Sequence, residues 1–324
     1  MIRSIPSQLN YGWLSSKDTI ERIDKKNLTR IVICGVGGSG IAGDLLRGLL
    51  YYDSSVSIEV LKDYTLPLWI KEDHFGIAIS YSGNTEETLS AWDSMRRRGL
   101  DILAITSGGT LEDNAIKQEH PIVRVPPGNP PRASIGYLFA PLLRLSYHWN
   151  LYDAAQSELE ASIDLINSRT EHWEAEMRSF AEGLKNTLPI IHTLDASFSA
   201  IGYRLSCQLN ENAKMIAHSS VYPEMNHNEI VGYEGDIRNL AIVVINPGVG
   251  FANHRNIVRR EIVLRRIIPE SLPVFSIDAE GGTRLERFIS LLVKVDLLSF
   301  FLASVRGVDP FRINSIERLK KELS

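Results

Sequence analysis

Two stretches decide the fold of this chain: Cys34-Gly-Val-Gly-Gly-Ser-Gly40 and Ser80-Tyr-Ser-Gly-Asn-Thr-Glu-Glu-Thr88. Each follows a short apolar run typical of a buried strand, at 30–34 and 76–80, and precedes a segment with helical spacing. Glycine lets the backbone approach a ligand, and the start of a helix offers unpaired N–H groups and a positive dipole end to an anion. The two loops therefore predict a phosphate site. Its expected donors are Gly38, Ser39, Ser80, Ser82 and Thr85.

The first loop alone is also compatible with a dinucleotide site. Gly35, Gly37 and Gly40 match the G-x-G-x-x-G fingerprint, and Asp63 stands near the position of a ribose-binding acid. A dinucleotide fold does not require a hydroxyl-rich loop after its third strand, whereas a sugar phosphate held from two sides does. Ser82 and Thr85 are also ordinary helix-cap residues, but two caps do not need so many hydroxyls. We therefore expect a phosphate site without a cofactor.

The rest of the chain alternates between strand-like and helix-like segments, which predicts parallel sheets covered on both faces. Further strands are expected at 56–61, 100–106, 122–125, 189–192, 240–245 and 272–277, and helices at 201–214, 255–267 and 284–305. Residues 132–184 lack glycine between Tyr137 and Gly183 and are expected to be helical and to link the two halves. We expect an N-terminal domain at 1–150 that carries the phosphate loops. A C-terminal domain at 151–324 should have no second glycine-rich phosphate loop.

Composition excludes several classes of function. The chain has 324 residues with 35 basic and 39 acidic side chains, and a formal net charge of −4 gives no basic field for nucleic acid. We find no apolar run of membrane-spanning length and no signal peptide, so the expected location is the cytoplasm. Cys34 and Cys207 fall in an expected strand and an expected helix, and we interpret them as core residues rather than a disulfide or a metal site.

Three later motifs extend the pattern: Pro130-Pro-Arg-Ala-Ser-Ile-Gly-Tyr137, Leu209-Asn-Glu-Asn-Ala-Lys214 and Pro223-Glu-Met-Asn-His-Asn-Glu-Ile230. Together with the two loops, their order resembles the bifunctional phosphoglucose/phosphomannose isomerases, which are built from sugar isomerase (SIS) domains. The resemblance implies an α/β fold with two SIS-type doubly wound domains and flanking helices. It also implies a homodimeric aldose–ketose isomerase that interconverts glucose 6-phosphate, and mannose 6-phosphate, with fructose 6-phosphate.

Such a reaction moves a proton between C1 and C2 through an enediol, which requires a base but neither a metal nor a redox cofactor. Glu211 is our candidate base. It lies toward the end of an expected helix with an apolar side, and apolar surroundings make a carboxylate a stronger base. From helix position alone, a surface charge paired with Lys214 is the commoner role of such a residue. The resemblance is what favours the catalytic role.

Three further residues complete the expected catalytic set. Histidine titrates near neutrality, and the resemblance gives His227 the opening of the sugar ring, in the site of the neighbouring subunit. Arg132 follows two prolines that restrict its backbone and could direct a guanidinium at an enediolate or a phosphate. By the resemblance Lys320 assists at the ring oxygen, although a basic helix end explains it equally well. The segment Asp309-Pro-Phe-Arg-Ile313 departs from the family pattern, which bears on substrate preference.

Other functions remain open at this stage. SIS domains also bind sugar phosphates without catalysis, and the natural substrate could be another phosphorylated sugar. A metal-dependent isomerase built on His218, Glu224, His227 and Glu229 is a further alternative, but their spacing fits no common ligand pair.

Overall fold

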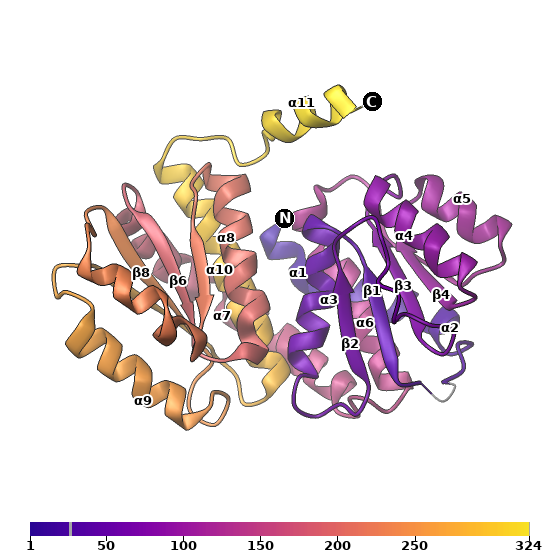
Figure 1. Ribbon diagram of the computed structural model, residues 1–324, viewed down its shortest axis with the longest axis horizontal. Coiled ribbons are helices and arrows are strands. Elements are labelled where there is room, and N and C mark those ends of the chain that lie inside the picture. Colours follow the sequence, from indigo (N-terminus) through magenta and orange to yellow (C-terminus); the bar gives the residue numbers. More distant parts are fainter. Residues whose placement is uncertain (26–27, 324) are drawn as a thin grey trace. The chain divides into compact units, whose positions relative to one another are not determined.

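The computed structural model describes residues 1–25 and 28–323, and its contacts divide the chain into two compact units. The first unit comprises 1–167 with 282–286, and the second comprises 168–281 with 287–324. Each unit is built around its own parallel sheet (Figure 1). The domain boundary expected between residues 150 and 151 stays a prediction.

The first unit contains a five-stranded parallel sheet in the order β2-β1-β3-β4-β5. Its strands are β1 (Arg30–Cys34), β2 (Ser57–Leu61), β3 (Phe75–Ser80), β4 (Asp101–Thr106) and β5 (Ile122–Arg124). Its helices are α1 (Ile5–Ser15), α2 (Lys17–Ile20), α3 (Gly37–Leu49), α4 (Glu86–Arg97), α5 (Gly109–Lys117) and α6 (Ile135–His148). The strand order reverses between the neighbours β1 and β3, and ligands of open α/β sheets bind at such switch points.

Helices cover both faces of this sheet. On one face, Val32 and Ala78 of the sheet pack in one buried cluster with Trp92 of α4 and Leu111 of α5. On the other face α3 lies so close that a side chain at Gly43 would meet Ile33 at 2.9 Å. Burial on both faces explains why the central strands β1 and β3 are almost continuously apolar, as expected from their sequence.

The second unit repeats this arrangement with four parallel strands in the order β7-β6-β8-β9. The strands are β6 (Leu188–Thr193), β7 (His218–Val221), β8 (Leu240–Asn246) and β9 (Val274–Asp278). The helices are α7 (Ala155–Leu184), which begins in the first unit, α8 (Ser199–Ala213), α9 (His254–Ile262), α10 (Arg284–Val305) and α11 (Asn314–Leu323). Short 3₁₀ helices lie at Ile2–Ser4, Pro131–Ala133, Ala196–Phe198, Glu224–His227 and Glu229–Glu234, and a π-helical turn at Val263–Ile267 extends α9. The doubly wound α/β class expected from the sequence is confirmed.

Two expectations about secondary structure are wrong in detail. The segment 132–184 is not one helical stretch, because α6 ends at His148, Asn150 adopts a left-handed conformation with φ of 53°, and α7 begins only at Ala155. Asparagine tolerates this conformation better than most residues, so the chain turns there without glycine. The polar strand β7 was not expected at all, since His-Ser-Ser-Val lacks an apolar pattern.

Contrary to expectation, one apolar segment does have membrane-spanning length. The 22-residue helix α10 contains an 18-residue stretch with a mean hydropathy of 2.0, which is long and apolar enough by composition. However, 83% of that stretch is buried within the protein. Its burial identifies α10 as a core helix.

Candidate active site

The first loop, between β1 and α3, packs directly against the segment that carries Arg132. A side chain at Gly38 would stand 2.7 Å from the Arg132 nitrogen and 2.8 Å from the Pro131 carbonyl carbon, so only glycine fits at this position. Arg132 lies in the 3₁₀ helix Pro131–Ala133 and is 8% exposed. Gly38 and Arg132, which are far apart in the sequence, therefore lie together at the start of α3.

The second loop, between β3 and α4, gathers hydroxyl groups. The hydroxyls of Ser80 and Thr85 lie 2.8 Å apart, and Ser82 Oγ accepts a hydrogen bond from Asn84 N at 3.3 Å. Gly83 has a φ of 71°, and an added side chain there would collide with the Gly108 carbonyl oxygen at 1.7 Å. Glycine is thus required for the close approach of the loops after β3 and β4.

Tyr81 connects the parts of this site, and the sequence analysis did not assign it a role. Its backbone N–H donates to Ser39 Oγ at 3.2 Å, which joins the second loop to the first. Its hydroxyl donates to the Pro126 carbonyl at 2.7 Å and accepts from Asn129 N at 3.1 Å, one residue before the Pro130-Pro131-Arg132 step. One buried tyrosine therefore joins the second loop to the first loop and to the segment that leads to Arg132. No sequence signal short of the fold identifies this role.

Lys62 is a second residue that the sequence analysis missed. Its Nζ lies 2.5 Å from Oδ2 of Asp44, which is buried in α3 and also pairs with Arg47 at 3.0 Å. A side chain at Gly40 would lie 3.4 Å from Lys62 Cε, so the lysine side chain packs against the first loop. By contrast Asp63, the residue considered for a ribose, accepts a hydrogen bond from the adjacent Tyr64 N at 2.6 Å.

In the second unit, Glu211 lies in the last turn of α8. Three polar side chains at one-turn intervals hold this helix to α10: Arg204 and Gln208 donate to the Asp296 carboxylate at 2.6–2.9 Å, and Asn212 donates to Ser299 Oγ at 3.0 Å. The Arg204–Asp296 pair is almost fully buried. The backbone that carries Glu211 is therefore fixed by hydrogen bonds on the neighbouring side of the helix.

Glu211 itself is half-buried and lines a pocket of about 630 Å³. The other lining residues are Asn210, Lys214, Val308, Asp309, Arg312, Ile313, Asn314, Ser315 and Ile316. Lys214 Nζ donates to the carbonyl oxygens of Glu211 and Asp309 at 2.6 and 2.8 Å. The pocket is within the size range of small-molecule sites, and its lining includes Asp309, Arg312 and Ile313 of the departing segment.

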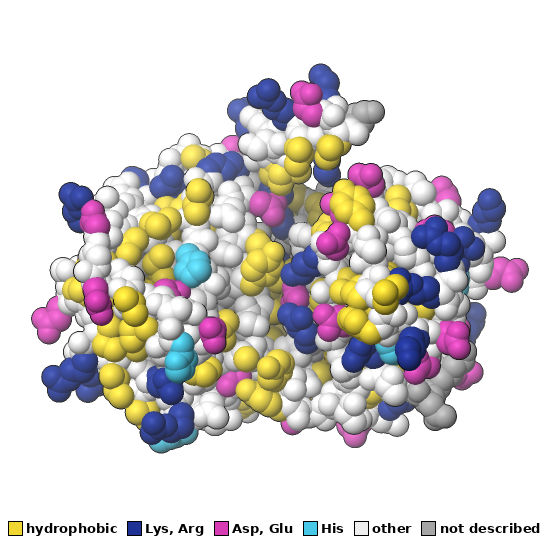
Figure 2. All heavy atoms as spheres, in the orientation of Figure 1, with side chains coloured by type: hydrophobic (Ala, Val, Ile, Leu, Met, Phe, Trp, Pro, Cys, Tyr) yellow, Lys and Arg dark blue, Asp and Glu magenta, His cyan; other side chains and the backbone are white. Residues whose placement is uncertain are grey.

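His227 and Lys320 both project into solvent. His227 ends the 3₁₀ helix Glu224–His227, and Lys320 lies on α11, which has no buried residue. Figure 2 shows hydrophobic side chains on one side of α11 and basic ones on another. The exposed apolar residues of this helix are Ile316, Leu319 and Leu323. Within their own unit, the structure does not place Glu211, His227 and Lys320 in direct contact through any bond that it gives.

The edge of the second sheet that corresponds to the phosphate loops has a different content. Asp195 follows β6 and is 2% exposed; its Oδ1 accepts from Ser197 N and Oγ at 3.0 and 2.7 Å, and its Oδ2 accepts from Asn253 N at 3.1 Å. A glycine-containing loop does follow β8, with Gly248 and Gly250 at φ of 90° and 84°. The second unit thus has a glycine turn after β8, but the N–H groups of Ser197 and Asn253 beside it already donate to the Asp195 carboxylate.

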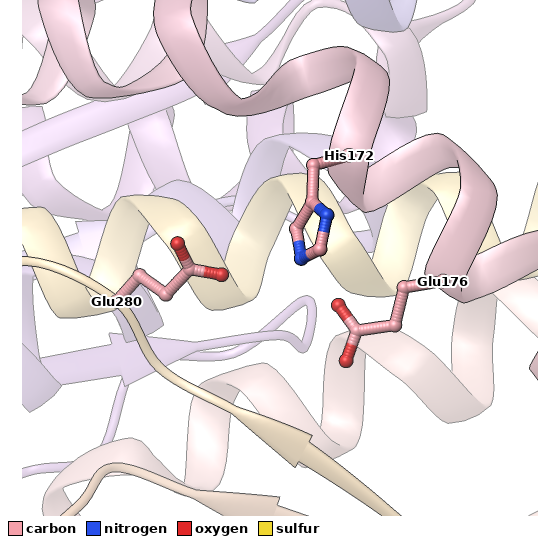
Figure 3. A group of neighbouring side chains, drawn as sticks. All are labelled: His172, Glu176 and Glu280. Carbon is pink, nitrogen blue, oxygen red and sulfur yellow. The ribbon is translucent and has the colours of Figure 1, made fainter.

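Three side chains in the described part of the chain could hold a metal ion, and none was a sequence candidate. His172 and Glu176 project from α7 toward Glu280, with ligand atoms within 4.8 Å of one another (Figure 3). Glu280 already accepts hydrogen bonds from Arg169 and Trp173 at 2.7 Å, and the buried Lys294 lies 3.0–3.1 Å from both glutamates. Two cations balance the two carboxylates, so the arrangement is that of an ion-pair network.

The comparisons with known proteins bear on the whole chain. It is 32% identical to a bifunctional phosphoglucose/phosphomannose isomerase of Caldicellulosiruptor bescii over 100% of this chain and 98% of the relative. The chain belongs to this family. Residues 174–323 also match the bacterial phospho-glucose isomerase C-terminal SIS domain.

Two other similar proteins are named for reactions on other sugar phosphates. A D-glucosamine-6-phosphate 4-epimerase of Sulfolobus acidocaldarius is 31% identical over 68% of this chain and 70% of its own length. Among solved structures, tagatose-6-phosphate ketose/aldose isomerase from Escherichia coli superposes with a TM-score of 0.72 at 14% identity, covering 95% of this chain and 92% of that chain. The structural similarity shows that the SIS fold is shared. The full-length relative establishes the family.

Proposed function

We propose that this phosphoglucose/phosphomannose isomerase family member interconverts glucose 6-phosphate and mannose 6-phosphate with fructose 6-phosphate. The observation that carries the proposal is the full-length match to an isomerase of that name combined with a hydroxyl-rich loop pair at the switch point of the first sheet. As a member of this family, the chain is a sugar-phosphate isomerase. We place it in the cytoplasm, where such substrates occur.

The phosphate is proposed to bind at the loops of the first unit. The hydroxyls of Ser39, Ser80, Ser82 and Thr85 and the backbone at Gly38 would donate to its oxygens, at the positive end of α3 and α4. Arg132 lies beside Gly38, so its guanidinium can compensate charge on the phosphate or on the enediolate that forms in the reaction.

Glu211 is the proposed base for the isomerisation. Its carboxylate takes the proton from C2 of the open-chain aldose, the electron pair of the C2–H bond forms the C1–C2 double bond, and the C1 carbonyl oxygen is protonated. Return of the proton to C1, with loss of the proton on O2, gives the ketose. The epimers glucose 6-phosphate and mannose 6-phosphate lead to the same enediol, so one base serves both substrates.

Ring opening is assigned to His227, with Lys320 at the ring oxygen, in a site shared between the subunits of a homodimer. The exposure of both side chains is compatible with a partner contact, and α11 carries an exposed apolar row that a second subunit would cover. The regular spacing of Ile316, Leu319 and Leu323 on one helix supports this interpretation.

A second candidate function is a reaction on another phosphorylated sugar. Two observations favour keeping it: the 4-epimerase relative, and Arg312 of the departing segment 309–313, which lines the pocket beside Glu211. Non-catalytic binding is the remaining alternative. The deciding experiment incubates the purified protein with fructose 6-phosphate in EDTA and quantifies glucose 6-phosphate and mannose 6-phosphate separately. Formation of both supports the proposal, and absence of both, with a control isomerase active, contradicts it.

Subunit mixing tests the shared site. Glu211→Gln and His227→Ala chains should each be inactive alone, but a mixed dimer would contain one intact site. Random exchange makes half of the dimers mixed, so about a quarter of wild-type activity should return. Lack of recovery, with exchange verified by mass-tagged chains, would place both residues in one subunit's site or remove His227 from the mechanism.

A further inference from the structure

The carboxylate of Glu229 joins three side chains of the second unit. Its Oε1 lies 2.7 Å from His192 Nε2 and accepts a hydrogen bond from the Tyr233 hydroxyl at 3.0 Å, while its Oε2 lies 2.9 Å from His218 Nε2. His192 belongs to β6 and His218 to β7. One carboxylate therefore bridges two neighbouring strands and the 3₁₀ helix Glu229–Glu234.

The bridge is largely shielded from water. The His192 side chain is completely buried, that of Glu229 is 16% exposed, and Tyr233 is buried as well. Burial alone would raise the pKa of Glu229. The hydrogen bond and charge interaction with His192 and the hydrogen bond from Tyr233 outweigh this effect and lower the pKa to about 2. Glu229 is thus ionised throughout the physiological pH range, and hydrogen bonds to an ionised acceptor are stronger than those between neutral groups.

The chain around His227 has few other constraints. Between β7 and β8 it forms only two short 3₁₀ helices, Glu224–His227 and Glu229–Glu234, which meet at Asn228 with φ of −146° and ψ of −73°. Met225 is anchored in the core, whereas His227 itself is exposed. Only Asn228 separates His227 from Glu229, so the two Cα atoms are at most about 7 Å apart and a shift at Glu229 is transmitted directly to His227.

We propose that Glu229 is a positioning residue for His227: by binding His192 and His218, it fixes the irregular segment so that the exposed imidazole faces the substrate ring. This inference rests on the proposed function, which gives His227 the ring-opening step. It also gives a use to the buried His192, which the proposed reaction does not otherwise involve.

The two histidine anchors are not equivalent, and this provides graded variants. His192 is inside the core, and its Nδ1 has no hydrogen-bond partner, so its replacement affects folding as well as position. The His218 side chain is 58% exposed, so His218→Gln removes one anchor at the surface. Glu229→Gln keeps the shape of the central residue but replaces one acceptor oxygen with an amide that cannot accept. Glu234→Gln is the matched control, because Glu234 is exposed in the same 3₁₀ helix.

The experiment isolates ring opening from proton transfer. In a Glu211→Gln background the isomerisation is blocked, and exchange NMR measures how fast the enzyme interconverts the α and β anomers of glucose 6-phosphate, a process that requires only ring opening. Adding Glu229→Gln should lower the catalysed rate about 10- to 100-fold, toward that of an added His227→Ala, because small displacements of a catalytic group have effects of this size. Adding His218→Gln should lower it about two- to fivefold, and Glu234→Gln should not change it.

The outcomes separate the inference from the function on which it rests. If Glu211→Gln protein does not accelerate anomer interconversion, ring opening by this protein is refuted and the positioning role with it. If it does, and His227→Ala abolishes the effect while Glu229→Gln and His218→Gln leave it unchanged, then only the positioning role is overturned. The same holds if Glu229→Gln lowers the melting temperature but not the catalysed rate. Because His218→Gln changes a surface residue, it keeps the test decisive even if Glu229→Gln protein fails to fold.

Discussion

At the carboxyl ends of β1 and β3 the first unit presents a set of hydroxyls and glycine turns, whereas at the carboxyl ends of β6 and β8 the second unit holds the buried carboxylate of Asp195. Both places are switch points of a parallel sheet, where helix starts face the same edge. In the second unit, the backbone N–H groups of Ser197 and Asn253 already donate to Asp195. An anion entering there would meet the negative charge of Asp195. The fold alone therefore does not make an anion site, because the backbone N–H groups at the sheet edge must also be left without a carboxylate of the chain itself.

In the proposed function the phosphate binds to the first unit, and the base that transfers the proton belongs to the second. The strongest test of this division is Glu211→Gln, which removes the base but leaves the phosphate cradle unchanged, that is, the two loops with Gly38, Ser39, Ser80, Ser82 and Thr85. We expect kcat to fall by about 10²- to 10⁴-fold, the usual contribution of a positioned base, with KM within a few-fold. Steady-state kinetics, together with the rate of solvent exchange at C2, measures both effects. Retention of more than a tenth of the wild-type kcat would remove Glu211 from the role of base.

The cradle itself is tested by replacing Ser80 and Thr85 together with alanine. The two hydroxyls bond to each other at 2.8 Å, so removing both leaves no unpaired partner in the empty site. KM for the sugar phosphate should rise about 10- to 100-fold, because hydrogen bonds to a charged oxygen contribute about 1.5–3 kcal/mol each and these two are coupled. Ser197→Ala, at the corresponding edge of the second sheet, is the control and should leave KM unchanged. Equal KM values for the double variant and the parent would place the phosphate elsewhere.

Asp195→Ala examines the filled switch point. It leaves the N–H groups of Ser197 and Asn253 without their acceptor, and an unpaired buried donor such as that of Ser197 costs about 1–3 kcal/mol. We expect a lower free energy of unfolding with an unchanged KM, measured by denaturant titration alongside the kinetic assay. Should phosphate stabilise this variant more than the parent against unfolding, the opened site would have become an anion site, which would make the comparison sharper still. A rise in KM would contradict the division between the units.

Acid should affect the second unit first, and this is the smallest effect that we predict. Burial raises the pKa of Glu280, but its bonds to Arg169, Lys294 and Trp173 lower it to about 2, and Glu229 is likewise at about 2. A carboxyl whose folded pKa is depressed stabilises the protein above its ordinary pKa of 4.5, and this contribution is lost as the pH falls toward the folded value. The stability of the second unit should therefore decrease between about pH 5 and pH 2.

The measurement uses 5-fluorotryptophan and ¹⁹F NMR. Trp173 is buried in the second unit and Trp92 and Trp149 are buried in the first, so their assigned signals report on the units separately. The Trp173 signal should change at a higher pH than the other two. Earlier loss of the Trp92 signal would show that the carboxylates of the second unit do not limit acid stability.

How much of this was accessible from the sequence depended on whether a feature is local. The strands β1 and β8 are recognisable because burial on both faces makes them continuously apolar, and the strand–glycine–helix order locates the phosphate loops. The polar edge strand β7 is stabilised by pairing with β6 rather than by burial of its own side chains, so its sequence has no apolar pattern that predicts a strand. The break between the helices at Asn150 was also missed, because asparagine adopts the left-handed conformation there and the usual signal for a helix end, a glycine, is absent from the sequence.

The site shows the same limit. That Gly38, Ser39, Ser80, Ser82 and Thr85 share one sheet edge follows from the rule that parallel strands end together. The buried connections made by Tyr81, and the carboxylate of Asp195, depend on contacts with residues distant in the sequence. The catalytic roles of Glu211, His227 and Lys320 depended on the family resemblance, that of Arg132 was argued from the two prolines before it, and all four stay predictions.

The hydrogen bond between Ser80 and Thr85 also has a consequence for turnover. In the empty site one of the two hydroxyls donates to the other, so a phosphate bound here as proposed would take that donor away from its neighbour, and the bond would re-form on release. Part of the attraction between the cradle and the phosphate is therefore offset in advance, which keeps product from binding too tightly. An enzyme whose substrate and product carry the same phosphate gains from such a site, because tight uniform binding of that group would slow release without accelerating the chemical step.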